Sequence, residues 1–341
     1  MSRPSDRPGE ILLAHGSGGR MTNELVRDLF LPRFLNEALA PLEDAARLKL
    51  GATRVAFTTD SFVVSPIVFP GGDLGKLSVC GTVNDLAVVG ARPVALSAGF
   101  VLEEGLPLAL LEQLVESMHR VCDEVGVPIV TGDTKVVERG SCDQIFVNTA
   151  GIGLLEEPLP EGVSAIQPGD RVLVSGGIAD HGMAVLSARN ELRFETPIES
   201  DCAPLWGLVQ RLLAAAPNVR WMRDPTRGGI GTALNELVAG GTFGIELIEE
   251  AIPVRASVRA LAEILGLDPL YVASEGRVVV VVGADAAERG VETMRGHPLG
   301  RDAVEIGRIV ADPPGRVFLR TRVGGSRLLD LLTGEQLPRI C

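Results

Sequence analysis

Residues 77–90 have the sequence LSVCGTVNDLAVVG, in which apolar residues recur at helical spacing up to a final glycine. This stretch predicts a helix over Leu77–Gly90. Strand-like runs lie on both sides of it, Arg54–Val64 before and Val94–Leu102 after. A helix between two strands is typical of an α/β chain. The stretch and its flanks therefore predict an α/β (α+β) fold.

The remaining periodic segments form two groups. The first group predicts helix Leu108–Val125, strand Pro128–Val137 broken at Thr131-Gly132-Asp133, and strand Ile145–Leu155. The second predicts strand Arg171–Ser175, helices His181–Asn190, Pro204–Ala215 and Gly231–Ala239, strands Ile245–Ile248 and Arg277–Val282, helix Ala284–Arg295, and strands Val304–Ile309 and Arg316–Leu319.

These groups predict two domains, over residues 1–155 and 170–320. A chain of 341 residues, 46% of them hydrophobic, is too long for one ordinary core. Three prolines and two glycines between residues 156 and 169 predict a linker there. Periodicity fades after Arg320, so residues 321–341 are expected to be a mobile tail.

The overall charge and the cysteines exclude several classes of protein. A net charge of −12 argues against a nucleic-acid partner, which would need clustered Lys and Arg. No apolar leader or window of membrane-spanning length is present, so we expect no membrane association. Five cysteines without CxxC spacing argue against a disulfide framework or a zinc cage. The expected compartment is the reducing cytoplasm.

A glycine-rich motif, His15-Gly16-Ser17-Gly18-Gly19, precedes a helix expected from Met21. Glycines before a helix let backbone N–H groups approach phosphate oxygens, and the helix N-terminus favours negative charge. His15, Gly16, Gly18 and Gly19 are therefore candidate nucleotide-binding residues. The alternative is a flexible turn. No GxxxxGK[ST] motif occurs in the chain, so a nucleotide site here is not a P-loop.

Four aspartates are expected at the ends of elements: Asp60, Asp85, Asp133 and Asp224. Carboxylates that converge from several elements suit Mg²⁺ on ATP phosphates, because this ion takes oxygen ligands. Asp60, Asp133 and Asp224 could instead be turn formers or caps. Asp85 is harder to explain in that way, since Asn84-Asp85 interrupts an apolar run where an unpaired buried charge is costly.

Three further side chains are candidates for the chemistry. Lys135 lies two residues beyond Asp133, and its ammonium suits a phosphoryl group in transfer. The alternative is a solvated lysine at a strand end. Glu275 and His181 are the acid–base candidates, although either could cap an element and Glu275 could pair with an arginine. The sequence does not decide between these roles.

Cys341 is the last residue of the chain. A thiol at the end of a mobile arm would be exposed, could attack an electrophile and could move between sites. The alternative is an accidental cysteine, because chain ends tolerate change. The other four cysteines lie in apolar surroundings and are expected to be inert core residues.

Taken together, these motifs resemble the HypE family of hydrogenase maturation factors in order and spacing. The aspartate motifs alone are similar to a wider superfamily of aminoimidazole ribonucleotide synthetase, selenophosphate synthetase and thiamine monophosphate kinase. The ending Pro338-Arg339-Ile340-Cys341 narrows the resemblance to HypE. The similarity runs from about residue 11 to the end. The segments that carry it are residues 14–19, 59–61, 81–86, 131–137, 223–229 and 338–341.

The resemblance implies a PurM-like (AIR synthetase-like) fold. In such a fold the N-terminal sheet pairs with the N-terminal sheet of a second subunit, and the two form a barrel in a homodimer. A C-terminal α/β domain follows. ATP binds between the two domains together with Mg²⁺. It further implies that a HypF-like carbamoyltransferase places a carbamoyl group on Cys341. The carboxamide is then dehydrated to a thiocyanate with ATP, and the cyanide passes to iron on a HypC–HypD complex.

Under this resemblance the residues take definite roles. Asp60, Asp85 and Asp133 are expected to hold Mg²⁺, and Lys135 to neutralise the transferring phosphoryl group. Glu275 is the first candidate for the base and His181 the second, while Cys341 carries the group throughout. The expected cofactor-binding residues are His15, Gly16, Gly18, Gly19, Asp60, Asn84, Asp85, Asp133, Lys135 and Asp224.

Two other functions remain open at this point. One is a kinase or synthetase of the superfamily that acts on a free small molecule, with Cys341 incidental. The other is a non-enzymatic module whose aspartates cap loops and whose tail docks a partner. The carboxylates with Lys135 weigh against the binding module, whereas only the C-terminal sequence weighs against the kinase.

Overall fold

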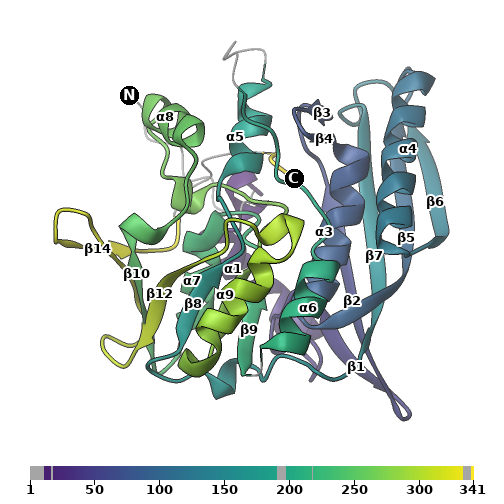
Figure 1. Ribbon diagram of the computed structural model, residues 1–341. Helices are drawn as coiled ribbons and strands as arrows, with labels where there is room; N and C mark the ends of the chain where they lie inside the picture. Colours follow the sequence, from purple (N-terminus) through teal and green to yellow (C-terminus); the bar gives the residue numbers. More distant parts are fainter. Residues whose placement is uncertain (1–10, 17, 190–196, 217, 333–338) are drawn as a thin grey trace.

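The computed structural model describes residues 11–16, 18–189, 197–216, 218–332 and 339–341. Its strands form a five-stranded sheet in the first half of the chain and a seven-stranded sheet in the second, with a small two-stranded hairpin beside the first. Helices cover both large sheets (Figure 1). The expected α/β (α+β) fold class is confirmed.

The five-stranded sheet has the order β1-β2-β7-β5-β6, in which only β5 and β6 are parallel. One of its faces is covered by two helices, of which α3 is buried on nearly all sides because α6 and β9 of the second half contact it too. The elements of this half are β1 (Ala46–Leu50), β2 (Thr53–Phe62), the hairpin β3 (Val68–Phe69) and β4 (Gly72–Asp73), α3 (Leu74–Val88), β5 (Ala91–Glu103), α4 (Leu108–Val125), β6 (Ile129–Val137) and β7 (Ile145–Leu155).

The other face of this sheet carries apolar side chains that a single chain leaves exposed. They come from β1, β2, β5 and β7, and the neighbouring β6 is an edge strand. An exposed apolar sheet face is typical of a surface that a partner covers. The uncovered face is compatible with a barrel shared by two subunits, which stays a prediction. Its exposed residues include Leu48, Leu50, Phe57, Val94, Val101 and Ile152.

The seven-stranded sheet has the order β14-β13-β10-β12-β8-β11-β9 and is mostly antiparallel, with β10 and β13 parallel. Its strands are β8 (Arg171–Val174), β9 (Val219–Arg223), β10 (Gly244–Ile248), β11 (Val279–Val282), β12 (Val304–Val310), β13 (Val317–Arg320) and β14 (Ser326–Leu329). Its helices are α5 (Asp180–Ser187), α6 (Trp206–Ala215), α7 (Gly229–Val238), α8 (Ala256–Leu265) and α9 (Ala287–Arg295).

Strand β11 shows why this sheet is covered on both faces. Val279 and Val281 join the core with α5, α7 and α8, whereas Val280 and Val282 join the core with α6 and α9. Successive side chains of a strand point to opposite faces, so a continuous valine run predicts burial on both. All four valines are fully buried. The core of this half is therefore two layers with the sheet between them.

Before the first sheet, the chain forms short helices against the second half. They are α1 (Arg20–Leu25), a π-helix (Val26–Phe30) and α2 (Leu31–Phe34). The connections between elements contain short 3₁₀ turns. They are η1 (Leu13–Gly16), η3 (Val163–Ala165), η4 (Glu249–Ala251), η5 (Pro269–Tyr271), η6 (Ala284–Ala286) and η7 (Pro298–Gly300).

Two details of the sequence prediction are wrong. The strand expected to break at residues 131–133 is continuous as β6, because a side chain at Gly132 would come within 2.3 Å of the Ala98 carbonyl, and glycine removes that clash. Asp133 therefore lies within a strand, and Asp85 lies inside α3; neither is at the end of an element. The helix expected over His181–Asn190 is observed as Asp180–Ser187, and Asn190 lies outside the described residues.

Part of the stretch expected to be a mobile tail, residues 321–341, has regular structure. Ser326–Leu329 form β14, which pairs antiparallel with β13. Residues 339–341 lie against the end of β2, and the C-terminus is between α5 and the β3–β4 hairpin (Figure 1). Residues 333–338, including Pro338 of the terminal motif, lie outside the described residues. The last three residues are thus docked in this conformation.

Asn84 joins the two halves of the molecule. Its Nδ2 donates to the carbonyls of Ala203 at 3.1 Å and Glu275 at 3.0 Å, and its Oδ1 accepts from the Leu205 N–H at 2.8 Å. The side chain is fully buried. Its hydrogen-bonding groups are therefore occupied within the chain, which gives it a structural role; its place among the nucleotide ligands stays a prediction.

We predict that Asn84→Ala lowers the free energy of unfolding by about 2–4 kcal/mol, because it leaves buried backbone groups without partners. Urea denaturation measures this. Asn148→Ala is the matched control, since Asn148 also makes three side-chain hydrogen bonds but on the exposed face. Equal losses in the two variants would contradict a special role for Asn84.

Candidate active site

A polar pocket of about 210 Å³ lies where the two halves meet. Residues from the first sheet, from α3, from the segments that follow β9 and precede β11, and from the end of the chain converge on it. Most of its charged groups are carboxylates. The lining residues are Asp44, Thr58, Thr59, Asp60, Gly81, Asp85, Arg223, Asp224, Thr226, Arg227, Glu275 and Cys341.

Three carboxylates in this pocket form a candidate metal site. Asp44 precedes β1, Asp85 lies in α3 and Asp224 follows β9, and each offers an oxygen within 4.8 Å of the others. Burial raises the pKa of Asp44 to about 7 and the pKa of Asp224 to about 6. Burial, together with the neighbouring aspartates, also raises the pKa of Asp85 well above its usual range.

This donor set fits Mg²⁺. Carboxylate oxygens are the ligands that a hard divalent cation prefers, and the cation would compensate for the burial and the mutual repulsion of the negative charges. Thr58 supports the arrangement, because its hydroxyl donates to Asp85 Oδ2 at 2.7 Å. Arg223 holds Asp44 with Nε 2.8 Å from Oδ1 and donates from Nη2 to Glu236 at 3.2 Å. These contacts hold Asp85 and Asp44 in place beside Asp224.

Asp60 and Arg227 form another side of the pocket. Burial raises the pKa of Asp60, and the Arg227 guanidinium opposes that shift. Arg227 also donates from Nη1 to the Gly16 carbonyl at 3.2 Å, which brings the glycine motif to the pocket. The positive charge of Arg227 faces a region that otherwise carries negative charge, so it can bind a phosphoryl oxygen or another anion there.

The C-terminal thiol lies inside the same pocket. Cys341 follows Ile340, which is 4% exposed and packs in the core with the end of β2 and the hairpin. Burial raises the pKa of the Cys341 thiol, while Arg227 lowers it. A neutral thiol is a poor nucleophile, so its place in the pocket suits a carried group better than an attacking sulfur.

Glu275 is the buried acid of the pocket. It is 1% exposed, and its Oε1 has no hydrogen-bond partner among the residues that the structure describes. Burial, followed by nearby acidic groups, raises the pKa of this carboxyl well above its usual range. Its backbone N–H donates to Asp201 Oδ1 at 3.1 Å. The side chain is thus free to exchange a proton with a group bound in the pocket.

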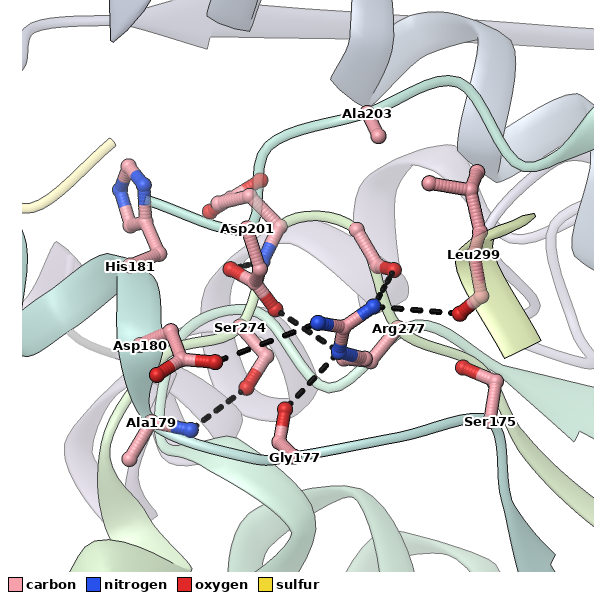
Figure 2. Close-up of polar contacts among 12 residues, drawn as sticks. Ser175, Gly177, Ala179, Asp180, His181, Asp201, Ala203, Ser274, Arg277 and Leu299 are labelled. Atoms are coloured by element: carbon pink, nitrogen blue, oxygen red, sulfur yellow. Dashed lines mark hydrogen bonds and ion pairs between the residues drawn. The ribbon is translucent and has the colours of Figure 1, made fainter. Parts of the chain in front are cut away.

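Arg277 fixes the backbone around Glu275. Arg277 donates to the carbonyls of Gly177 at 2.8 Å and Leu299 at 3.2 Å, and its Nε lies 3.5 Å from Asp201 Oδ2 (Figure 2). Asp180, which is fully buried, lies 3.9 Å from the same guanidinium. Because Asp201 binds both Arg277 and the Glu275 N–H, this network determines where Glu275 lies.

His181 does not line the pocket. It lies in the first turn of α5, fully buried, with Nε2 2.8 Å from the Ile340 carbonyl and Nδ1 2.8 Å from Ser200 Oγ. Burial lowers the pKa of His181. Both ring nitrogens are therefore hydrogen-bonded, and His181 lies next to the chain end.

The other expected ligands lie elsewhere in the single chain. Asp133 and Lys135 are both exposed on edge strand β6, pair with each other at 2.8 Å and do not line the pocket. In the glycine motif, Gly18 donates its N–H to Thr22 Oγ1, and a side chain at Gly19 would come within 2.7 Å of the Leu332 carbonyl. Gly19 is thus explained by close backbone packing. His15 Nδ1 accepts from the Leu12 N–H.

Sequence reasoning missed Asp44 and the two arginines of the pocket. Asp44 precedes a short strand without any motif, so nothing in the sequence marks it. Arg223 and Arg227 lie in the segment 223–229 that carried the resemblance, and their charge beside Asp224 was the available signal. The metal set that the structure favours is therefore Asp44, Asp85 and Asp224.

Comparisons with known proteins show the family of this chain. The chain matches the family models "AIR synthase related protein, N-terminal domain" over residues 42–155 and "AIR synthase related protein, C-terminal domain" over residues 167–320. It is 52% identical over 341 residues to carbamoyl dehydratase HypE of Azotobacter vinelandii, which covers 100% of each chain. The chain belongs to the HypE family. It is 46% identical to HypE of Escherichia coli K12 over 336 residues, 97% of this chain and 99% of that one.

Solved HypE structures share the fold. A crystal structure of a HypE–HypF complex matches with a TM-score of 0.85 and 48% identity over 90% of this chain and 99% of that one. A structure of HypE in complex with ATP matches with a TM-score of 0.81 and 47% identity over 97% and 100%. Thiamine monophosphate kinase of Aquifex aeolicus, at 18% identity and a TM-score of 0.64, shows the PurM-like fold alone. Within the described residues, no helix has the length and apolar character that a bilayer span requires.

The raised pKa values predict a specific dependence of stability on pH. Asp44 and Asp224 are protonated more readily in the folded state than in the unfolded state. Their contribution to the free energy of unfolding is therefore full below the ordinary aspartate pKa of 3.8, and it is lost as pH rises through about 6 to 7. We predict that Mg²⁺ raises the thermal midpoint at about pH 7.5 and has little effect near pH 4.5.

Asp85→Asn separates this effect from nonspecific binding of the ion. The variant should be more stable than the parent without Mg²⁺ at neutral pH, because it removes one of the repelling charges, and should lose most of the response to Mg²⁺. Asp123→Asn, at an exposed carboxylate of α4, is the control and should keep the response. An unchanged response in Asp85→Asn would contradict the assignment.

Proposed function

We propose that this chain dehydrates an S-carbamoyl group on its own Cys341 to a thiocyanate, with ATP, and so provides the cyanide ligand of [NiFe]-hydrogenase iron. The observation that carries the proposal is the position of Cys341 in the pocket with the carboxylates and Glu275. Carbamoyl dehydratase is the activity for which its full-length relatives are named. A solved relative was crystallised with ATP.

The proposed chemistry activates a poor leaving group. In the first step the carboxamide oxygen attacks the γ-phosphorus of ATP, ADP leaves, and the nitrogen loses one proton. In the second step the resulting O-phosphoryl imidate loses its remaining N–H proton and phosphate, which gives the C≡N group. Mg²⁺, when bound, neutralises charge on the ATP phosphates. Asp44, Asp85 and Asp224 would hold it, with Asp60 beside them.

Arg227 and Glu275 supply the groups that act on the bound carboxamide. The Arg227 guanidinium faces the sulfur end of the pocket and can stabilise the negative charge of the phosphoryl oxygens. Glu275 receives the proton from nitrogen in its ionised form, and its burial makes it a stronger base than an exposed glutamate. His181 is the weaker candidate, because both of its nitrogens are already hydrogen-bonded.

Lys135 and Asp133 require the second subunit in this proposal. They are exposed on the edge strand of a sheet whose apolar face is uncovered in the single chain. If that face pairs with a second copy in a homodimer, β6 borders the interface. The Lys135 ammonium then neutralises charge on a nucleotide that the two subunits share.

One partner transfers the carbamoyl group to the Cys341 sulfur in this proposal, and another accepts the cyanide from it. A solved relative is a complex of HypE with HypF, which supports a HypF-like carbamoyltransferase as the enzyme that loads Cys341. A HypC–HypD complex that bears iron is the proposed acceptor of cyanide. Such an acceptor would have to be an electron-rich metal centre, which would give an electron pair to the thiocyanate carbon as the S–C bond breaks and Cys341 leaves as a thiolate with the bonding pair.

Mass spectrometry of the intact C-terminal peptide tests the function. After carbamoylation, addition of ATP and Mg²⁺ should remove the mass of one water from the Cys341 adduct, and a non-hydrolysable ATP analogue should not. Glu275→Gln and Lys135→Ala should keep the carbamoyl adduct, with turnover lowered on the order of 100-fold or more.

Two outcomes would contradict the proposal. ATP turnover that persists after deletion of Cys341 would favour a kinase or synthetase acting on a free small molecule. Absence of Mg²⁺-dependent ATP binding would favour a docking module. Unchanged carbamoyl-dependent turnover in Lys135→Ala would remove the role given to that residue.

A further inference from the structure

The segment that carries Glu275 is bound by neighbouring loops through its own backbone. The Ser274 N–H donates to the Pro225 carbonyl at 3.0 Å, and Ser274 Oγ accepts from the Ala179 N–H at 2.9 Å. The Glu275 N–H donates to a carboxylate, Asp201 Oδ1, at 3.1 Å. A charged side chain therefore holds the backbone of the proposed base directly.

Gly276 allows Asp201 to approach this backbone closely. A side chain at Gly276 would overlap the Asp201 carbonyl and lie 3.0 Å from the Ala203 nitrogen. The Asp201 side chain is 1% exposed, so it is buried against the segment of the base. A hydrogen bond to a carboxylate is stronger than one between neutral groups, and burial strengthens it further. Glycine at position 276 and aspartate at position 201 are thus two parts of one contact.

Asp201 is one of two buried carboxylates that face the Arg277 guanidinium (Figure 2). Arg277 Nε lies 3.5 Å from Asp201 Oδ2, and Nη2 lies 3.9 Å from Asp180 Oδ2. Asp180 Oδ1 in turn lies 3.5 Å from Arg255 Nη1. Among the described residues, neither Asp180 oxygen nor Asp201 Oδ2 accepts a hydrogen bond. The two carboxylates are therefore compensated by charge alone at these atoms, and an uncompensated buried charge is costly.

The charges of this network act on one another. Burial and then Asp201 raise the pKa of Asp180 to about 6, whereas Arg255 and Arg277 oppose that shift. The Arg277 guanidinium itself is fixed, because it donates to three backbone carbonyls. It therefore provides a stationary positive charge that holds both carboxylates.

We propose that Asp201 is a positioning residue for the dehydration, which orients Glu275 through its backbone, and that Arg277 and Asp180 hold Asp201 for that role. This rests on the proposed function. None of the three lines the pocket, so none of them touches the reacting group. The hydrogen bond from the Glu275 N–H determines where the chain turns toward the pocket, and the carboxyl that it directs has no partner at Oε1 among the described residues.

The positioning role requires an acceptor oxygen at position 201 and not its charge. Asparagine keeps an oxygen that can accept from the Glu275 N–H, whereas alanine removes it. A displaced base slows proton abstraction, since a small misplacement of a catalytic group costs much of the rate. ATP binding should not change, because Asp201 lies outside the pocket.

The test compares Asp201→Ala with Asp201→Asn, Asp180→Asn and a matched control, Asp170→Ala. Asp170 is 2% exposed, its Oδ2 accepts from the Gln167 N–H at 3.0 Å, and the same oxygen lies 3.4 Å from Arg220 Nε. It thus has the same kinds of partner as Asp201, but at the opposite end of β8 from Asp180. Both alanine variants should lower the thermal midpoint by similar amounts.

The first readout is the single-turnover rate at which the carbamoylated protein is dehydrated, measured against ATP concentration. Asp201→Ala should lower the maximal rate on the order of 30-fold and leave the half-saturating ATP concentration within about twofold of the parent. Asp201→Asn should stay within about threefold of the parental rate. Asp180→Asn should be severalfold slower, and Asp170→Ala should match the parent.

The second readout is hydrogen exchange at the Glu275 amide, resolved by fragmentation of the peptide that contains it. This amide should exchange on the order of tenfold faster in Asp201→Ala than in the parent, because its acceptor is lost. It should stay slow in Asp201→Asn and in Asp170→Ala. This measurement needs no carbamoyl chemistry.

Equal maximal rates in Asp201→Ala and Asp170→Ala would overturn the positioning role. So would an Asp201→Asn variant as slow as Asp201→Ala, which would mean that Asp201 acts through its charge. Asp180→Asn changes no described hydrogen bond, so it tests the network even if Asp201→Ala does not fold; a parental rate in this variant would remove Asp180 from it. If the parent failed to dehydrate its adduct while amide exchange followed the expected order, the proposed function would be wrong and the contact between Asp201 and Glu275 would stand.

Discussion

Two consecutive polar side chains in a buried helix, Asn84 and Asp85, determine how the halves of this molecule meet. Successive side chains of a helix point in directions about 100° apart. Asn84 reaches the backbone of the second half, and Asp85 reaches the pocket. The buried amide has partners only when the halves meet in this register. The same register places Asp85 beside Asp224 and in one pocket with Glu275, so fold stability and site geometry depend on one helix.

The charges of the pocket are arranged for ligands that bring compensating charge. Several buried carboxylates have raised pKa values, whereas Arg223 and Arg227 provide positive charge at two sides. Such a site is costly when empty and favourable when a cation and phosphates enter. The thiol of Cys341 stays neutral there. A group that the sulfur carries into this environment meets an acid, an arginine and a cation site without diffusing in solution.

Much of this could be predicted from the sequence, and the failures have physical causes. Hydrophobic periodicity predicted α4 and β7 with their observed bounds. In α4 the buried residues recur at helical spacing, and in β7 every second residue is buried. It missed β9, whose arginines pair with acids and hide the pattern, and α8, whose apolar spacing was available as a signal. Asp60, Asp85, Asp224, Glu275 and Cys341 meet in one pocket. Asp133 and Lys135 do not, because the chain alone leaves their strand at an edge, and Asp44 lies in a segment without a motif.

The central claim is that a group on Cys341 lies beside the cation held by Asp44, Asp85 and Asp224. It can be measured directly by carbamoylating the thiol with a ¹³C-labelled carboxamide and titrating Mn²⁺ in place of Mg²⁺, with ¹³C relaxation as the readout. The account predicts strong broadening of the carboxamide signal at stoichiometric Mn²⁺, reversed by excess Mg²⁺ and absent in Asp85→Asn. A carboxamide signal that stayed sharp while Mn²⁺ was bound to the protein would contradict it.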